Sequence, residues 1–338
     1  MALRLFRYSA TVLLLVLCLT GCQSGPVEIT TSEVLFNDPA IEELCTCAGP
    51  SGQEALIWGW DMTGSGSNLV GVDLASREQS IVFPDISVFN FDLAWTSDGR
   101  FIAVDCYGCP DLSILNRDSG EILTRIPDTH EAAWSTDSRY LAVQPFGKEV
   151  LRILETQTWE IVVDLPKRNT LNLGTAWSPQ GSYVASVDNR SLYIWDTVEW
   201  QEKILIRTTT HLFNYLAWSP DEQYIAASTY DGITRVFDVE TGDLVYEFVP
   251  DGFITTGVGS ALAWSPDGRY LAAGSVVAGS SDLLAGLIYI LDSETGQPEY
   301  VLSGHTSVIY CIDWVADQHS LVSSSYDHTV RLWNLDAR

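Results

Sequence analysis

The sequence predicts an all-β fold: a single seven-bladed β-propeller whose last blade is completed by a strand from the N-terminal part of the chain. Three observations predict this fold. A tryptophan-centred unit recurs six times, each unit divides into short apolar strands separated by turns, and the 338 residues show no long helical periodicity. Hydrophobic residues make up 46% of the chain, so it can bury a large core.

The repeated unit carries a tryptophan on its first strand. This tryptophan recurs every 40 to 50 residues or so, about the length of a four-stranded propeller blade. Because its place in the unit is fixed, we expect the ring to pack in the core, with a sugar-binding aromatic surface as the alternative. The six positions are Trp95, Trp134, Trp177, Trp218, Trp264 and Trp314.

Turns divide each unit into four strands. A turn of the Ser-Pro-Asp-Gly type follows the tryptophan strand, and a second apolar strand comes next. A third strand, a Thr-Gly-type turn and a fourth strand complete the unit. The third strands are predicted at LSILN, LRILE, LYIWD, TRVFD, IYILD and VRLWN.

A seventh, weaker unit precedes the other six. Its strands are predicted at residues 43–47, 55–60, 68–73 and 80–83. The last unit stops after its third strand, and residues 31–36 can supply the missing fourth strand. Such pairing closes the ring and removes an exposed sheet edge. The predicted divisions are therefore a signal peptide at 1–21, a lipidated cysteine and tether at 22–30, and the propeller at 31–338.

The segment GHTSVIYCIDW, followed by SSSYDHTVRLWN, resembles a WD repeat, and LYIWD contains the Trp-Asp pair itself. The resemblance covers residues 85–338 clearly and 31–84 weakly. It implies a propeller that binds proteins and a structural hydrogen-bonded tetrad in the last unit. The tetrad residues are His305, Ser323, Asp327 and Trp333, and acid–base chemistry at the His–Asp pair is the alternative.

The N-terminal residues have the pattern of an export signal. Arg4 and Arg7 precede an apolar run at 10–19, which is too short for a comfortable transmembrane helix. The run ends in Leu-Thr-Gly-Cys, which resembles the lipobox of bacterial lipoproteins. The resemblance implies cleavage before Cys22, acylation of Cys22 with fatty acids such as palmitate, and anchoring to the outer leaflet of the plasma membrane or to the outer membrane. An ordinary signal peptide is the alternative.

The charge balance excludes two classes of partner. Lys and Arg number 18 against 44 Asp and Glu, a formal net charge of −26. Nucleic acids and anionic lipid surfaces both require basic patches. We therefore expect no nucleic acid partner, membrane contact only through the lipid anchor, and a self-repelling monomer.

The cysteines favour a local disulfide. In an exported protein, Cys106 and Cys109 span a turn and can pair with each other. Zinc binding together with Cys45 and Cys47 is the first alternative, and thiol–disulfide catalysis is the second. Cys311 is expected to be a buried thiol.

Two surfaces are candidates for binding a partner. Trp159 and Trp200 occupy equivalent turns where other units carry glycine, and they present either an exposed aromatic pair or rings packed on their own blades. A lengthened loop at 274–286 projects from the opposite face, unless it is a long hairpin. Its apolar side chains are Val276, Val277, Leu283 and Leu284.

The sequence contains no HExxH, P-loop, EF-hand or GxGxxG motif. We therefore expect a non-catalytic interaction scaffold with no catalytic, metal or cofactor residues, bound to an envelope or extracellular protein. One alternative is a propeller hydrolase or lyase, for which Asp92, Asp105 and Asp313 are scattered candidates. The other is a propeller that senses a small ligand or cation at its central channel face.

Overall fold

In the computed structural model, every regular element of the described residues is a β-strand, which confirms the predicted all-β class. The described ranges are 25–37, 41–48, 54–61, 69–74, 76, 78–83, 93–105, 111–170, 174–208, 212–252, 261–278, 284–315, 317 and 319–336. Within these ranges no helix is long and apolar enough to cross a membrane.

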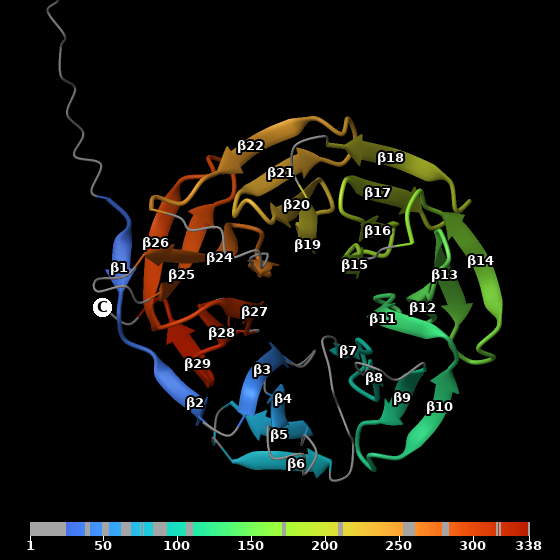
Figure 1. The fold of residues 1–338 in the computed structure, drawn as a ribbon, viewed down its shortest axis with the longest axis horizontal. Coiled ribbons are helices and arrows are strands. Elements are labelled where there is room, and N and C mark those ends of the chain that lie inside the picture. Colours follow the sequence, from blue (N-terminus) through green and yellow to red (C-terminus); the bar gives the residue numbers. More distant parts are fainter. Residues whose placement is uncertain are drawn as a thin grey trace, which may run out of the picture.

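The described strands form seven sheets arranged as a ring (Figure 1). Three of them come from the first half of the chain. The first sheet contains β3 (Ile41–Ala48), β4 (Glu54–Asp61), β5 (Leu69–Asp73) and β6 (Gln79–Phe83). The second contains β7 (Leu93–Trp95), β8 (Phe101–Val104), β9 (Leu112–Asn116) and β10 (Ile122–Ile126). The third contains β11 (Thr129–Trp134), β12 (Tyr140–Pro145), β13 (Val150–Glu155) and β14 (Ile161–Pro166).

The remaining four sheets follow the same plan. One contains β15 (Gly174–Trp177), β16 (Tyr183–Val187), β17 (Ser191–Asp196) and β18 (Glu202–Arg207). The next contains β19 (Phe213–Trp218), β20 (Tyr224–Thr229), β21 (Thr234–Asp238) and β22 (Leu244–Phe248). Then come β23 (Leu262–Trp264), β24 (Tyr270–Ala278), β25 (Leu284–Asp292) and β26 (Pro298–His305). The last sheet contains β27 (Ile309–Trp314), β28 (Ser320–Ser325) and β29 (Thr329–Asn334).

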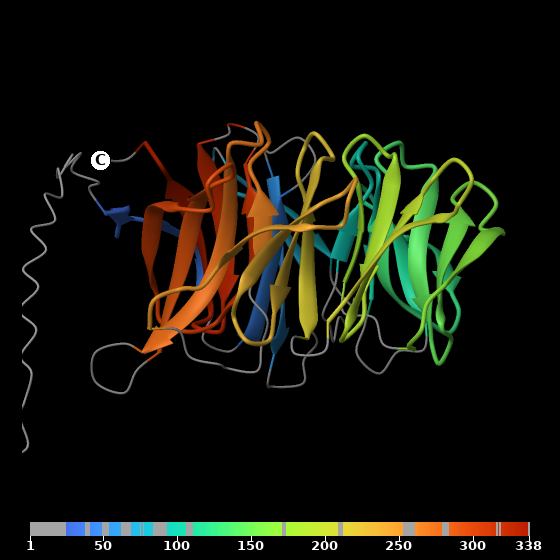
Figure 2. The same ribbon diagram turned by 90° about the horizontal axis from the view of Figure 1, so that it is seen from above.

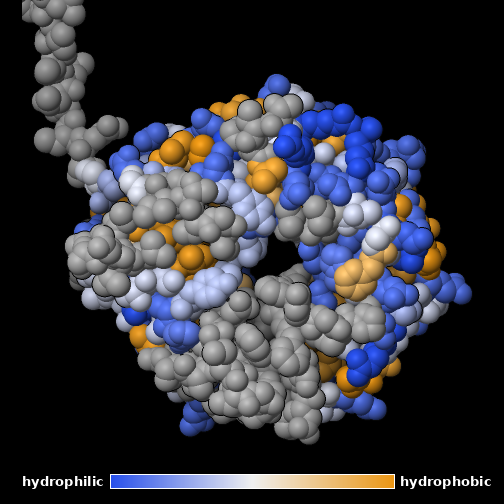
Figure 3. Space-filling view, viewed as in Figure 1, coloured by the Kyte–Doolittle hydropathy of each residue, from blue (hydrophilic) through white to orange (hydrophobic). Residues whose placement is uncertain are grey.

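Consecutive strands within each sheet pair antiparallel, as in a propeller blade. The first strands of neighbouring sheets contact one another in the order β7, β11, β15, β19, β23, β27 and β3. Seen from the side, strands run between two faces where the connections gather (Figure 2). Seen down the ring, the molecule is hollowed at its centre, and hydrophilic residues dominate the coloured part of that face (Figure 3).

The weaker first unit is confirmed, because β3 to β6 lie where the four strands were predicted. The third strands are also confirmed at β9, β13, β17, β21, β25 and β29. The loop predicted at 274–286 is wrong, since β24 and β25 continue through most of it. They pair from Tyr270 with Asp292 to Ala278 with Leu284, so this segment is the long hairpin considered as the alternative.

The N-terminal segment lies against two of the sheets. β1 (Val27–Ile29) pairs parallel with β26, and β2 (Glu33–Asn37) pairs antiparallel with β29. The predicted tether at 22–30 is therefore wrong for the residues of β1. Ile29 is 4% exposed and packs in the core with Leu302, so burial of this side chain holds the short strand in place.

The repeated tryptophans join neighbouring sheets, which confirms core packing for those whose contacts are described. The indole Nε1–H of each donates to a backbone carbonyl on the first strand of the preceding sheet. The bonds are Trp134 to Ala94 (3.1 Å), Trp177 to Ala133 (2.9 Å), Trp218 to Ala176 (3.1 Å), Trp264 to Ala217 (3.1 Å) and Trp314 to Ala263 (3.0 Å). The ring therefore fills the space between two sheets while its polar atom finds a buried partner.

The turn after each tryptophan is built by side-chain hydrogen bonds. Ser265 Oγ donates to Asp267 Oδ1 at 2.6 Å and accepts the backbone N–H of Tyr270 at 2.8 Å. Gly268 has a φ of 75°, a conformation that suits glycine. The same serine and aspartate bonds occur at Ser135 and Ser219, so the turn chemistry repeats with the sequence.

Candidate functional site

The four tetrad residues form one buried hydrogen-bonded chain. Trp333 Nε1–H donates to Ser323 Oγ at 2.8 Å, and Ser323 Oγ lies 2.8 Å from His305 Nε2. His305 Nδ1 lies 2.8 Å from Asp327 Oδ2. One neutral tautomer satisfies every bond: Ser323 donates to Nε2, and Nδ1–H donates to Asp327. The sequence therefore located the correct four partners.

Asp327 also holds the turn between β28 and β29. It accepts the backbone N–H of Thr306 at 2.9 Å and the hydroxyl of Thr329 at 2.6 Å. Burial opposes ionisation of Asp327, but the hydrogen bond from His305 and these two bonds outweigh it, so its pKa lies well below the ordinary value. Burial lowers the pKa of His305, with Asp327 opposing. His305 is 2% exposed, which leaves its ring no access to a substrate.

Trp159 and Trp200 do occupy equivalent turns, with φ of 59° at each. Both side chains are half-buried. The Trp159 ring meets Trp134 edge-on at 6.3 Å between centroids. The Trp200 ring meets Tyr140 at 5.6 Å and Trp177 at 6.1 Å, edge-on in both cases. These contacts favour the packed alternative over a fully exposed aromatic pair.

The other predicted surface lies on the β24–β25 hairpin. Val276 is 5% exposed and so does not present its side chain to solvent, whereas Val277 is half-buried. Leu284 begins β25, and its side chain lies outside the described residues, as does the whole of Leu283.

Several other predicted sites lie wholly or partly outside the described residues. Cys22 and the entire export signal lie outside the described residues, as do Cys106, Cys109 and Asp92. Cys45 and Cys47 are on β3, but their side chains are not described. Cys311, expected to be buried, is half-buried on β27.

The two remaining acidic candidates accept hydrogen bonds from backbone N–H groups. Asp105 accepts the backbone N–H of Glu131 at 3.1 Å, and Asp313 accepts that of Trp314 at 2.9 Å. Among the described residues, no group of three or more His, Cys, Asp or Glu side chains is placed to hold a metal ion.

Sequence reasoning missed a buried lysine on the loop after β14. Lys167 is 6% exposed, and its Nζ donates to Gln144 Oε1 at 3.1 Å. Burial lowers the pKa of Lys167 to about 8, although Glu131 and Asp188 favour its charged form. Nothing in the surrounding sequence distinguishes this lysine from a surface lysine.

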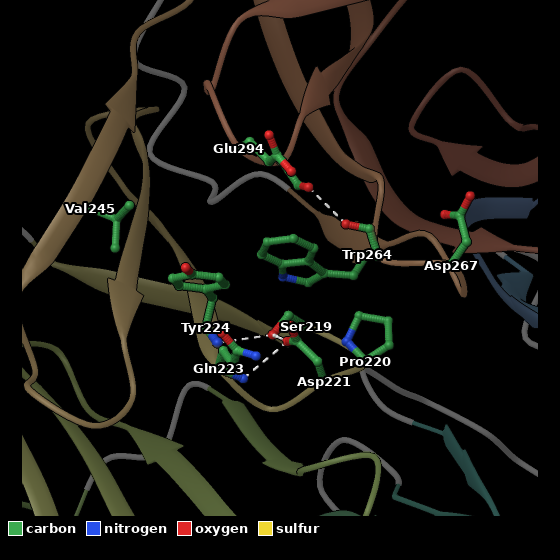
Figure 4. Close-up of a pocket in the computed structure, with 11 residues that line it drawn as sticks. Ser219, Pro220, Asp221, Gln223, Tyr224, Val245, Trp264, Asp267 and Glu294 are labelled. Atoms are coloured by element: carbon green, nitrogen blue, oxygen red, sulfur yellow. Dashed lines mark hydrogen bonds between the residues drawn. The ribbon is translucent and has the colours of Figure 1, made fainter.

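Sequence reasoning also missed a pocket between two neighbouring sheets. It measures about 440 Å³ and lies between the β19–β22 sheet and the β23–β26 sheet (Figure 4). Figure 4 shows the rings of Tyr224 and Trp264 between Glu294 at the top of the view and Asp221 at the bottom. The lining residues are Ser219, Pro220, Asp221, Gln223, Tyr224, Val245, Trp264, Asp267, Gly268, Ser293 and Glu294.

Comparisons with known families locate WD40 repeats in the second half of the chain. The family model described as WD domain, G-beta repeat matches residues 247–282 and 296–334. The model of the anaphase-promoting complex subunit 4 WD40 domain matches residues 175–256. These matches lie within the sheets from β15 onwards and leave out residues 283–295, which include β25.

Three curated proteins are similar to part of this chain, and two of them are periodic tryptophan proteins. A periodic tryptophan protein 2 homolog from Caenorhabditis elegans is 27% identical over 172 residues, which is 49% of this chain and 17% of the relative. Periodic tryptophan protein 2 from Saccharomyces cerevisiae is 25% identical over 177 residues, 41% of this chain and 19% of the relative. Denticleless protein homolog B from Xenopus laevis is 34% identical over 72 residues, 19% of this chain and 10% of the relative.

Each match therefore spans less than a fifth of the relative's length. This chain carries WD40 repeats and folds as an all-β propeller.

Proposed function

We propose that the protein is a non-catalytic interaction scaffold, exported and anchored by lipid at Cys22. The observation that carries the first part is the buried His305–Asp327 pair. It is the pair most suggestive of acid–base chemistry, yet each of its ring nitrogens and carboxylate oxygens already bonds within the protein. A pair held in this way stabilises a turn and is not available to react with a substrate.

We further propose that the seven sheets are the blades of one closed ring, sealed by the N-terminal strand. Two observations support this: β2 pairs along β29, and β3 contacts β27. A closed ring gives the rigid faces on which a scaffold presents its connecting loops.

Crosslinking in the native envelope tests the scaffold. The full-length protein is crosslinked, solubilised in detergent and captured, and the partners are identified by mass spectrometry and rebound as purified proteins. We expect one stoichiometric protein partner that is lost when residues 279–283 are shortened. Recovery of the protein alone would contradict the scaffold.

Metabolic labelling with an alkyne analogue of palmitate tests the anchor. The wild-type protein should take up the label and sediment with membranes, because several acyl chains anchor a protein stably. Cys22→Ser should lose both properties, while Cys18→Ser should keep them. Equal labelling of Cys22→Ser and the wild type would rule out the lipid anchor at this position.

A further inference from the structure

A basic side chain covers the aromatic residue at the start of the second strand in several sheets. Arg100 lies over the Phe101 ring at 5.1 Å, and Arg139 lies over Tyr140 at 5.0 Å. Lys203 and Arg269 cover the corresponding Tyr183 and Tyr270 at 5.5 and 4.8 Å. Cations at these distances are attracted to the face of the ring. The chain thus repeats a cation–aromatic contact from sheet to sheet.

Tyr224 occupies the same position in the β19–β22 sheet but follows Gln223, which is uncharged. Its ring is half-buried and borders the 440 Å³ pocket. None of the residues that line this pocket is Lys or Arg. The aromatic surface is therefore present here without the basic residue that accompanies it elsewhere.

The outer side of the pocket differs from the outer side of the Tyr140–Trp177 stack, which lies at the corresponding place between two other sheets. In three other sheet pairs the corresponding tyrosine and tryptophan stack, for example Tyr140 on Trp177 at an interplanar angle of 8°. At the Tyr140–Trp177 stack alone, Trp200 closes the outer side; beside the Tyr183–Trp218 stack the equivalent turn carries Gly242. At the pocket the equivalent turn carries Gly296, which contributes no ring. Gly296 is also fixed as glycine, because a Cβ would lie 2.5 Å from the Tyr246 ring.

Carboxylates complete the pocket. Three acidic residues line it, and all three are exposed to solvent: Asp221, Asp267 and Glu294. A cation entering from solvent would thus meet an aromatic surface and negative charge together, in a molecule whose net charge is −26.

We propose that this pocket binds the side chain of an arginine presented by a protein partner. A guanidinium is planar and stacks on aromatic rings, while its N–H groups reach carboxylates in the same plane. In the described part of the chain, four basic residues cover aromatic rings, and three of them are arginines. Binding of a partner's arginine rests on the proposed scaffold function. Arginine binding by the pocket can nevertheless be measured without knowing the partner.

The probe is Nα-acetyl-arginine methylamide, and its binding to the full-length protein is measured by saturation-transfer NMR. We expect transfer to the side-chain methylenes of the probe. The citrulline analogue, which has nearly the same shape but no charge, should show about tenfold weaker binding.

Gln223→Arg is the decisive variant. Gln223 is exposed, so the change should not disturb folding, and the new arginine should cover Tyr224 as Arg139 covers Tyr140. The side chain of the new arginine then occupies the pocket, so probe binding should be lost. Gln157→Arg adds the same charge at an exposed turn on another sheet and should leave binding unchanged. Glu294→Gln should weaken binding because it removes a lining charge.

Equal probe binding by the wild type and Gln223→Arg would overturn the proposed arginine site. An equal loss of probe binding in Gln157→Arg would also overturn it, because the loss would then follow from the added charge alone. Either result leaves the scaffold itself standing, since that is tested by envelope crosslinking. Conversely, probe binding without a crosslinked partner would support the pocket and contradict the scaffold.

Discussion

At the scale of single residues, the Asp327 carboxylate accepts hydrogen bonds from His305, Thr306 and Thr329. Asp327→Ala should lower the free energy of unfolding by about 1–3 kcal/mol, because it leaves buried donors on His305 and Thr329 without an acceptor. Urea denaturation measures the change. The matched control is Asp336→Ala: the Asp336 carboxylate also faces a histidine, His319, at 3.5 Å, but both side chains are exposed. Equal stability of the two variants would refute the structural role of the tetrad.

Two histidines, the buried His305 and the half-buried His130, predict that stability falls in mild acid. Burial lowers the pKa values of His305 and His130 below the ordinary 6.5, although Asp327 and Asp105 oppose the shifts. Below about pH 6.5 the unfolded chain therefore binds protons that the folded chain does not, so stability decreases as pH falls. Each histidine can contribute up to about 1.4 kcal/mol per pH unit.

Urea unfolding at a series of pH values between about 7.5 and 5.5 measures this slope, above the range where carboxylates titrate. His130→Gln should reduce the slope. His319→Gln, at a site 62% exposed, should leave it unchanged. A slope that is the same in all three proteins would exclude His130 as a source of the pH dependence.

At the scale of elements, the indole hydrogen bonds join one sheet to the next. Trp218→Phe keeps an aromatic ring between the sheets but removes the donor to the Ala176 carbonyl. Trp195→Phe is the matched control, since Trp195 is fully buried and its Nε1 has no hydrogen-bond partner. Both changes remove similar ring volume, so Trp218→Phe should cost about 1 kcal/mol more. Thermal melts of the two variants compare them, and a larger loss in Trp195→Phe would contradict this role.

The repeat pattern explains why strands were predictable and the pocket was not. Each tryptophan strand and each turn is specified within about ten residues, so local sequence was enough to place them. Trp159 and Trp200 were placed correctly in their turns by alignment with glycines elsewhere. The pocket instead lies between Tyr224 and Trp264, which come from two different sheets. It also depends on the absence of a basic residue at Gln223 and of a ring at Gly296, and no local sequence pattern predicts such a combination.

At the scale of the whole molecule, the segment before β3 crosses the outside of two sheets. Its first strand has three residues, too few to show alternation, so the sequence led us to a tether there. Ile29 buries its side chain, and Ser32 Oγ accepts a hydrogen bond from Arg331 at 2.9 Å. The segment therefore belongs to the fold.

Removal of this segment should weaken the whole ring. A chain beginning at residue 39 lacks β1 and β2, so it exposes the β29 edge and the core around Leu302. An exposed edge strand pairs readily with another chain. We expect a lower melting temperature and concentration-dependent association in light scattering, whereas a chain beginning at residue 25 should show neither change relative to the longer protein. If the shorter chain melts like the longer one, β2 contributes nothing to ring closure, and the sheets are held together by contacts between their inner strands alone.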